Sequence, residues 1–412
     1  MDSVLRSHAD AIIKASITAV LPDEAVRRAL DGQEFPGRVL LVSAGKAAWQ
    51  MAKAAYDFWG DKIENGVVVT KYDHVMGSIG HYACFEAGHP VPDENSFKGT
   101  QAALDLVADL TENDTVLFLL SGGGSALFEK PLVSGEILQD ITGQLLACGA
   151  DIVEINTIRK RLSAVKGGRF ALACAPAKVF SIVLSDILGD PLDMIASGPA
   201  VPDTSTCEQA VAIAKKYDLK MPESAWALLE QETPKSLTNV TTQINGSVKE
   251  LCVAAAAACR ELGYEPIMLT DQLCCQAKEA GSFLASVLKT HAGGGKNLAF
   301  LAGGETVVQL TGSGKGGRNQ ELALAAAVGI AGISGAAVFS VGSDGTDGPT
   351  DAAGGYTDYT TAGELKAQGI EIFDVLKQND AFHALQRVGG LVYTGPTGTN
   401  VNDVAVALLK VE

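Results

Sequence analysis

The sequence predicts an α/β protein built from two domains. A chain of 412 residues is too long for a single hydrophobic core. Short continuous apolar runs, typical of strands buried on both faces, recur between helical stretches. Several of these runs lead straight into glycine-rich turns, and α/β sheets bind their ligands at the carboxyl ends of strands. The pattern therefore predicts binding sites at several strand ends.

Composition narrows the classes of partner. A net charge of −16 argues against a nucleic-acid or membrane-surface role. The eight cysteines show no ligand-like spacing, which is typical of reduced thiols in a cytoplasmic protein. The N-terminus lacks the features of a signal peptide, and no apolar run approaches the ~20 residues of a membrane helix. We expect small-molecule partners, no nucleic acid and no membrane, and a homodimer is one open arrangement.

The first strand and turn carry a candidate cation. Residues 4–30 predict amphipathic helix, residues 38–42 a buried strand and residues 47–58 a helix, with Gly45-Lys46 in the turn between the last two. A cation is unfavourable at a helix start unless an anion binds there. Lys46 is therefore an anion-binding candidate, and a solvated lysine is the alternative. The spacing is not that of a Walker motif.

A polar stretch follows the next strand, predicted over residues 66–70. It contains His74, His81, Glu86 and His89, but their spacing fits no helical pair of zinc ligands. We interpret residues 88–93 as a structured loop near the ligand-binding site that we expect at the strand ends.

The strand predicted over residues 115–120 runs into three consecutive glycines. Ser121, Gly122, Gly123, Gly124 and Ser125 form a loop with hydroxyls on both flanks. Three consecutive glycines cost backbone entropy on folding, and a plain turn seldom needs them. The loop is a candidate binding loop for a phosphate or a substrate carboxylate. A structural strand-to-helix turn is the alternative.

Basic and acidic candidates follow in the same half of the chain. Arg159, Ser163 and Lys166 have helical spacing and could share one face, although such charge runs are usually solvated surfaces. The strand over residues 179–184 then leads to Asp186 and Asp190. Paired carboxylates at a strand end suit Mg²⁺, and ordinary turn aspartates are an equal alternative.

A polar, proline-punctuated stretch over residues 204–240 predicts the domain boundary, so we expect domains at 1–235 and 236–412. The second domain repeats the α/β pattern. Helices are expected over 248–262 and 277–290, and strands over 266–269 and 298–302.

The glycine-rich segment after that last strand is the main candidate site. Glu305 lies where the strand ends, and a short strand is expected over 307–310. The loop 311–317 has almost no side chains, so its N–H groups could face an anion. Arg318 and Asn319 then stand just before a helix that we expect from Glu321 onward. A flexible hairpin followed by a helix start is the alternative.

A second acidic loop follows the strand predicted over residues 337–341. Asp344 and Asp347 lie among glycines, but the pattern lacks the ligand positions and the closing glutamate of an EF-hand. A metal- or hydroxyl-binding loop at a strand end is the better functional interpretation. The chain ends in residues 394–403 and a short apolar tail.

These motifs together resemble the glycerate 2-kinase family. The matching segments span nearly the whole chain in order: SAGKAA at 43–48, SGGGSAL at 121–127, NTIRKRLSAVKGGRFA at 156–171, SDILGDPLDMIASGPAVPD at 185–203, GGETVVQLTGSGKGGRNQEL at 303–322, GSDGTDGPTDAAGG at 342–355 and TGPTGTNVND at 394–403. The resemblance implies ATP-dependent phosphorylation of the 2-hydroxyl of D-glycerate with a divalent metal such as Mg²⁺. It also implies a Rossmann-like, three-layer parallel-sheet N-terminal domain and a smaller α/β C-terminal domain, with the active site between them. The catalytic lysine and arginine of the family fall on Lys46 and Arg318.

The chemistry of the residues agrees with a kinase, because phosphoryl transfer needs positioning and positive charge around the moving group. Mg²⁺ would bind aspartates among Asp186, Asp190, Asp344 and Asp347. The Ser121–Ser125 loop with Arg159 or Lys166 would hold the substrate carboxylate. The rivals are an NAD(P)H-dependent hydroxypyruvate reductase, for which no GxGxxG is visible, and a non-catalytic sugar-acid or nucleotide-binding protein.

Overall fold

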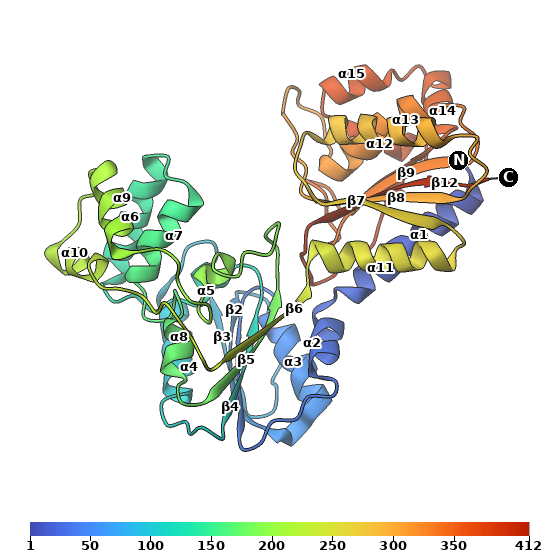
Figure 1. The fold of residues 1–412 in the computed structure, drawn as a ribbon. Helices are drawn as coiled ribbons and strands as arrows, with labels where there is room; N and C mark the ends of the chain where they lie inside the picture. Colours follow the sequence, from blue (N-terminus) through green and yellow to red (C-terminus); the bar gives the residue numbers. More distant parts are fainter. Residues whose placement is uncertain (412) are drawn as a thin grey trace. The chain divides into compact units, whose positions relative to one another are not determined.

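The computed structural model describes residues 1–411, which form two compact units with one six-stranded sheet each (Figure 1). One unit is Pro22–Asn245. The other combines Met1–Leu21 with the chain from Gly246 onward. Within the described residues, no helix has the length and apolar character needed to cross a bilayer.

The sheet of the unit Pro22–Asn245 has the strand order of a Rossmann-type fold. Its order is β3-β2-β1-β4-β5-β6. The strands are β1 (Val39–Ala44), β2 (Ile63–Lys71), β3 (Ala83–Ala87), β4 (Thr115–Leu120), β5 (Lys178–Leu184) and β6 (Val240–Gly246). Neighbours from β3 to β5 pair in parallel. The chain order reverses between β1 and β4, and the crevice beyond such a reversal is where these sheets bind ligands. The predicted α/β fold is confirmed.

Helices cover both faces of this sheet. On one face, α2 (Pro22–Leu30) and α3 (Ala48–Trp59) pack on residues such as Leu41 and Leu117. On the other, α4 (Glu94–Leu106) and α8 (Arg169–Ala173) pack on the alternate residues, such as Val42 and Val116. A separate apolar cluster joins α6 (Gly135–Ala147), α7 (Ile152–Arg161), α9 (Cys207–Lys216) and α10 (Glu223–Leu229). The remaining short elements are α5 (Gly124–Leu127), η1 (Gly60–Lys62) and η2 (Ile195–Ser197).

The second sheet is mixed, with the order β11-β10-β9-β12-β8-β7. Its strands are β7 (Glu265–Leu273), β8 (Leu298–Gly304), β9 (Ala336–Gly342), β10 (Gly354–Asp358), β11 (Leu391–Val392) and β12 (Asp403–Leu409). β12 lies antiparallel between β8 and β9, and Asp403 pairs with both Gly304 and Gly342. The start of β12 therefore meets the carboxyl ends of β8 and β9.

Helices also cover both faces of the second sheet (Figure 1). α1 (Ser3–Ala19) and α11 (Val248–Glu261) pack together on one face, and α12 (Ala277–His291) and α13 (Arg318–Ile330) pack on the other. α14 (Thr361–Ala367), α15 (Ile372–Lys377) and α16 (Ala381–Arg387) extend the α13 layer.

Several elements differ from the sequence-based expectation. The polar stretch after β2 contains β3. The stretch 204–240, expected to form the domain boundary, contains the helices α9 and α10 and ends where β6 begins. Residues 307–310 form no strand, because Val307 makes only an isolated bridge to Gln276. The apolar tail is β12, which lies inside the sheet. α13 begins at Arg318, three residues before the expected start.

Candidate active site

Lys46 lies against the triple-glycine loop at the point where the strand order reverses. The Lys46 N–H donates to the carbonyl oxygen of Gly122 at 2.8 Å, and the Ala47 N–H donates to Ser121 Oγ at 3.1 Å. Gly45 has φ +124°, and a Cβ there would lie 2.2 Å from Ser121 Oγ. The glycine is therefore required for the two turns to approach each other.

Two further side chains close around the same loop. A Cβ on Gly122 would lie 2.2 Å from Asp186 Oδ2, and one on Gly123 would lie 3.0 Å from His89 Cδ2 and 3.1 Å from Lys46 Cγ. Burial, together with the charges of Lys46 and Lys71, lowers the pKa of His89, so its imidazole is neutral at neutral pH. The sheet edge thus brings together a cation, a carboxylate, a neutral imidazole and bare main chain.

A buried ionic cluster holds this loop from behind. Lys166 Nζ donates to the carbonyl oxygens of Ser125 (2.9 Å) and Phe128 (3.1 Å), and Arg159 Nη2 donates to that of Ser125 (2.8 Å). The carboxylate of Glu129 lies 3.5 Å from Lys166 and 3.7 Å from Arg159. Burial lowers the pKa of Lys166 to about 8.

The arrangement of the two cations therefore differs from the predicted one. α7 ends at Arg161, so Arg159, Ser163 and Lys166 share no helical face. The Lys166 side chain is fully buried, and its ammonium group is directed at main-chain oxygens. Lys166 fixes the loop and has no surface to offer a substrate carboxylate.

The predicted aspartates after β5 lie in a strained segment. Asp190, Ala196 and Ser197 have φ values of +51°, +52° and +60°, which non-glycine residues rarely adopt. Asp190 Oδ1 is buried without a hydrogen-bond partner among the described residues. Ser197 Oγ donates to Asn156 Oδ1 at 2.9 Å and lies 3.3 Å from Ser125 Oγ. This segment therefore supports the triple-glycine loop from a second side.

In the other unit, Arg318 is held by two carboxylates. Its Nε and Nη2 donate to Asp403 at 2.6 and 3.1 Å, and its Nη1 donates to Glu305 at 2.7 Å. Although burial opposes the charge, Asp403 and Glu305 raise the pKa of Arg318. Three of its five N–H donors are used, which leaves two for a ligand.

Asp347 occupies the N-terminus of α13. Its carboxylate accepts from the main-chain N–H groups of Asn319 (3.1 Å) and Gln320 (2.8 Å) and from Asn319 Nδ2 (3.3 Å). Burial raises the pKa of Asp347 to about 7. The helix-start donors that the sequence suggested for an external anion thus bind a carboxylate of the protein itself.

The glycine-rich loop 311–317 is fastened to residues 378–380. Asn379 Oδ1 accepts from the N–H groups of Thr311 (2.7 Å) and Gly312 (2.9 Å). The Gly314 N–H donates to the Gln378 carbonyl oxygen, and the Lys315 N–H donates to Asp380 Oδ1. A Cβ on Gly312 or Gly314 would lie within 2.6 Å of Gln378 main-chain atoms. Close packing explains these glycines, and their N–H groups are not directed at a phosphate.

A pocket of about 790 Å³ lies beside this loop, entirely within the second unit. Asp344 contributes a carboxylate whose Oδ1 accepts from the Thr346 N–H at 3.0 Å. The pocket is lined by Glu305, Thr306, Val307, Val308, Leu310, Gly312, Gly314, Gly316, Gly317, Arg318, Glu321, Asp344, Thr346, Asp347, Gly348, Pro349, Asn379 and Ala381.

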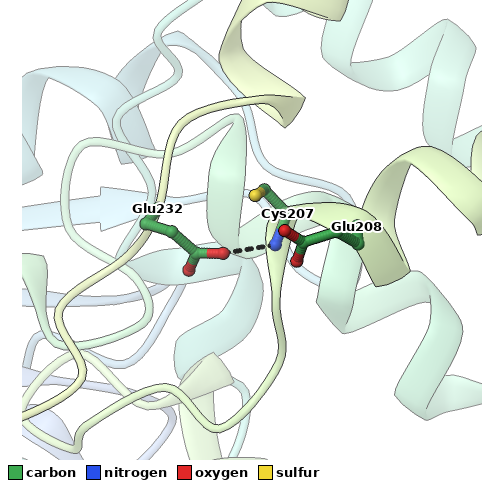
Figure 2. A group of neighbouring side chains, drawn as sticks. All are labelled: Cys207, Glu208 and Glu232. Carbon is green, nitrogen blue, oxygen red and sulfur yellow. Dashed lines mark hydrogen bonds between the residues drawn. The ribbon is translucent and has the colours of Figure 1, made fainter.

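The four predicted metal ligands fall in different units, Asp186 and Asp190 in one and Asp344 and Asp347 in the other. Among residues 1–411, the one group of three clustered metal-type ligands is Cys207, Glu208 and Glu232. Figure 2 shows that Glu232 accepts from the Cys207 main-chain N–H at the start of α9. Glu232 also forms an ion pair with Lys235. The hydrogen bond between Glu232 and Cys207 is the main factor that raises the pKa of the Cys207 thiol. This group therefore forms a helix N-terminus and offers no thiolate ligand.

The sequence patterns do not identify Asp403 and Asn379 as site residues. Asp403 closes the segment 394–403, and Asn379 lies in a segment without a recognisable motif. The arginine beside the glycines does indicate that a carboxylate partner exists somewhere in the chain. It does not show which carboxylate, because the partners of Asp403 and Asn379 are tens of positions away in the sequence.

A Rossmann-type sheet with a lysine at its reversal point, in a chain with a second α/β unit, defines a class of two-domain ligand-binding proteins. Family models agree with this division. A domain of unknown function, DUF4147, matches residues 8–230, and the MOFRL family matches residues 298–403.

Comparison with known proteins shows the family to which the chain belongs. A D-glycerate 2-kinase of Thermotoga maritima is 53% identical, with 98% of each chain covered. A glycerate 2-kinase of Pyrococcus horikoshii is 41% identical over 92% of this chain and 90% of the relative. The crystal structure of a Thermotoga maritima glycerate kinase matches with a TM-score of 0.96, covering 99% of this chain and 100% of that one at 53% identity. The chain belongs to the glycerate 2-kinase family.

Proposed function

We propose that the protein is an ATP-dependent kinase that phosphorylates the 2-hydroxyl of D-glycerate to give 2-phosphoglycerate. The observation that carries the proposal is Lys46 against the Ser121–Gly124 loop at the reversal point of the sheet. This arrangement occurs in a chain that is 53% identical over nearly its whole length to a protein named D-glycerate 2-kinase.

The assigned residues have distinct roles in this reaction. The hydroxyl oxygen attacks the γ-phosphorus, the bond to the ADP oxygen breaks, and the hydroxyl proton must be accepted. Lys46 and Arg318 are the cations that we assign to the transferred phosphoryl group. Asp186 and the neutral His89 border the triple-glycine loop, and either can accept the proton.

We assign the loop from Ser121 to Ser125, which has hydroxyls on both flanks, as the binding site for the D-glycerate carboxylate. Arg159 fixes the position of this loop through its hydrogen bond to the Ser125 carbonyl oxygen. Lys166 supports the same loop from within the core. The proposal therefore keeps Arg159 and Lys166 as positioning residues.

Mg²⁺ fits the donor chemistry of several assigned carboxylates. Asp190 Oδ1 is a buried oxygen without a donor among the described residues, and Glu305 and Asp344 line the second unit's pocket. Mg²⁺ prefers one or two such carboxylates together with phosphate oxygens and water. When bound, it would neutralise phosphate charge. Asp347 is the weaker candidate, because its oxygens already accept from the start of α13.

The experiment combines purified protein with D-glycerate, ATP and Mg²⁺, and follows ADP release while ³¹P NMR identifies the product. We expect 2-phosphoglycerate, and loss of product with Lys46→Ala. Oxidation of NAD(P)H with hydroxypyruvate and no ADP would support the reductase instead. Binding of both ligands without turnover would indicate a binding protein.

We also propose a cytoplasmic location, with D-glycerate and ATP as partners and no nucleic acid, in keeping with the charge of −16. A homodimer stays a prediction that light scattering of the purified protein tests directly.

A further inference from the structure

We infer that the pocket beside loop 311–317 is the nucleotide site, with the base on its apolar wall and the phosphates toward Arg318. The inference rests on the proposed function and deepens it, because it assigns one of the two substrates to one unit. The triple-glycine loop of the other unit is then left for the hydroxy acid.

Size is the first argument. The pocket measures about 790 Å³, toward the upper end of the roughly 300–1,000 Å³ of small-molecule and cofactor sites. A three-carbon acid would leave most of that space to water. By contrast, His89, Lys46 and Asp186 crowd the triple-glycine loop so closely that a single added Cβ would touch them.

The exposed apolar wall is the second argument. Val307 and Leu310 line the pocket with relative exposures of 54% and 80%, and Leu310 is the most exposed large apolar side chain among the described residues. Between them Val308 packs partly against the core of the sheet, whereas Val307 and Leu310 stay exposed. A planar, largely apolar base is the part of ATP that gains by covering such side chains.

The third argument comes from the way loop 311–317 is held. Its N–H groups at Thr311, Gly312, Gly314 and Lys315 donate to residues 378–380, away from a phosphate. The glycines that line the pocket therefore present main chain without side chains. That surface suits contact with a flat ring better than capture of an anion.

Charge orients the ligand. Arg318 lines the pocket with two N–H donors left over, and Glu305 and Asp344 supply oxygens for a metal ion carried by the phosphates. The apolar residues Val307, Val308 and Leu310 and this polar group line the same pocket. A ligand with an apolar ring and an anionic tail matches both, whereas an anion alone matches only the second.

The test measures binding by the full-length protein without turnover. Isothermal titration with the Mg²⁺ complex of adenylyl imidodiphosphate, which is not hydrolysed, gives Kd for wild type and for Leu310→Ser. We expect the variant to raise Kd at least about tenfold. Phe373→Ser, which changes a side chain 71% exposed on α15 in the same unit but outside this pocket, is the matched control and should change Kd less than twofold.

Two further measurements separate the possible outcomes. Inorganic tripolyphosphate with Mg²⁺ should bind both proteins equally, because Leu310 contacts the base and not the phosphates. The KM for ATP should rise in Leu310→Ser while the KM for D-glycerate stays the same. Equal Kd values for the nucleotide analogue in wild type and Leu310→Ser would overturn the inference and leave the kinase standing. No analogue binding and no ADP from wild type would overturn the proposed function itself.

Discussion

Among single residues, Arg318 shows how a cation can be fixed without being wholly neutralised. Asp403 is buried and binds the guanidinium through two hydrogen bonds, whereas Glu305 is half-exposed and binds through one. Charge-assisted, bidentate pairs are stronger and more directional than single exposed ones. The orientation of Arg318 should therefore depend mainly on Asp403.

This difference gives a matched pair of variants. Asp403→Asn should lower kcat by about ten- to a hundredfold, since a displaced cation loses roughly 1.4–2.8 kcal/mol of transition-state stabilisation. Glu305→Gln should lower it by only a fewfold. Steady-state kinetics with a thermal unfolding control checks the order, and a larger loss in Glu305→Gln would contradict the assignment.

Asp347 should make stability depend on pH. Burial raises its folded pKa to about 7, well above the ordinary value of about 3.9 for an unfolded aspartate. Between those two values the folded protein holds a proton that the unfolded chain releases, so this group's contribution to stability is present at acid pH and is lost as pH rises through 7. Asp347→Asn should flatten the fall of Tm between pH 5 and pH 8. Equal slopes for variant and wild type would show that another group controls it.

Three of the candidate residues share one property. Lys46, Ser121 and Asp186 each lie within two residues after a buried strand, and the parallel sheet brings such positions to one edge. Asp403 is the first residue of its strand, and its antiparallel pairing brings it to the same edge as Glu305 from the opposite chain direction. No local pattern distinguishes that strand start from a loop.

Among elements, the glycine-rich loop depends on one side chain. Asn379 is buried, has φ +54°, and accepts from two loop N–H groups while donating to the Gln309 carbonyl oxygen and to Glu321. Asn379→Ala should free the loop, so that trypsin cleaves after Lys315 several times faster than in wild type. Gln378→Ala keeps the main-chain contact and is the control. Unchanged cleavage in Asn379→Ala would contradict this role.

Helix packing gives a second prediction for elements. Gly281 lies in α12, and a Cβ there would lie 2.1 Å from the Leu322 carbonyl oxygen of α13. Gly281→Ala should destabilise the protein by about 1–3 kcal/mol, because the two helices must separate. Gly143 in α6 has open space around its Cβ position, so Gly143→Ala should stabilise by about 0.5–1 kcal/mol. Denaturant unfolding checks the opposite signs, and two equal shifts would refute the packing explanation.

The elements that sequence predicted correctly were continuous apolar strands and long periodic helices. β3 was missed because it is a short, only partly buried edge strand interrupted by Glu86, and β6 because it lies at the edge of its sheet with a polar sequence. β12 is fully buried, but its place at the end of the chain suggested a tail. Hydrophobic runs identify buried strands and carry little information on polar edges or on strand order.

For the whole molecule, the division of the chain differs from the expected domains 1–235 and 236–412. α1 packs on α11, the Asp2 N–H donates to Asp358 at 2.6 Å, and His8 Nδ1 lies 2.8 Å from the Tyr264 hydroxyl. Periodicity predicted this helix and its apolar face, but it could not show which sheet the face covers. β6 lies beyond residue 235 and pairs with β5, so a boundary at residue 235 would also separate an edge strand from its sheet.

We propose that the units 22–245 and 1–21 with 246–412 are the folding domains, and fragments test this. The fragment 22–245 should unfold cooperatively by itself, because it keeps all six strands of its sheet. The fragment 246–412 should not fold alone, since α1 buries Leu5, Ile12 and Ile13 and leaves their contacts open when it is absent. Adding a peptide of residues 1–21 should restore its cooperative thermal transition by circular dichroism. Independent folding of 1–235 and 236–412, with no effect of the peptide, would instead support the boundary expected from the sequence.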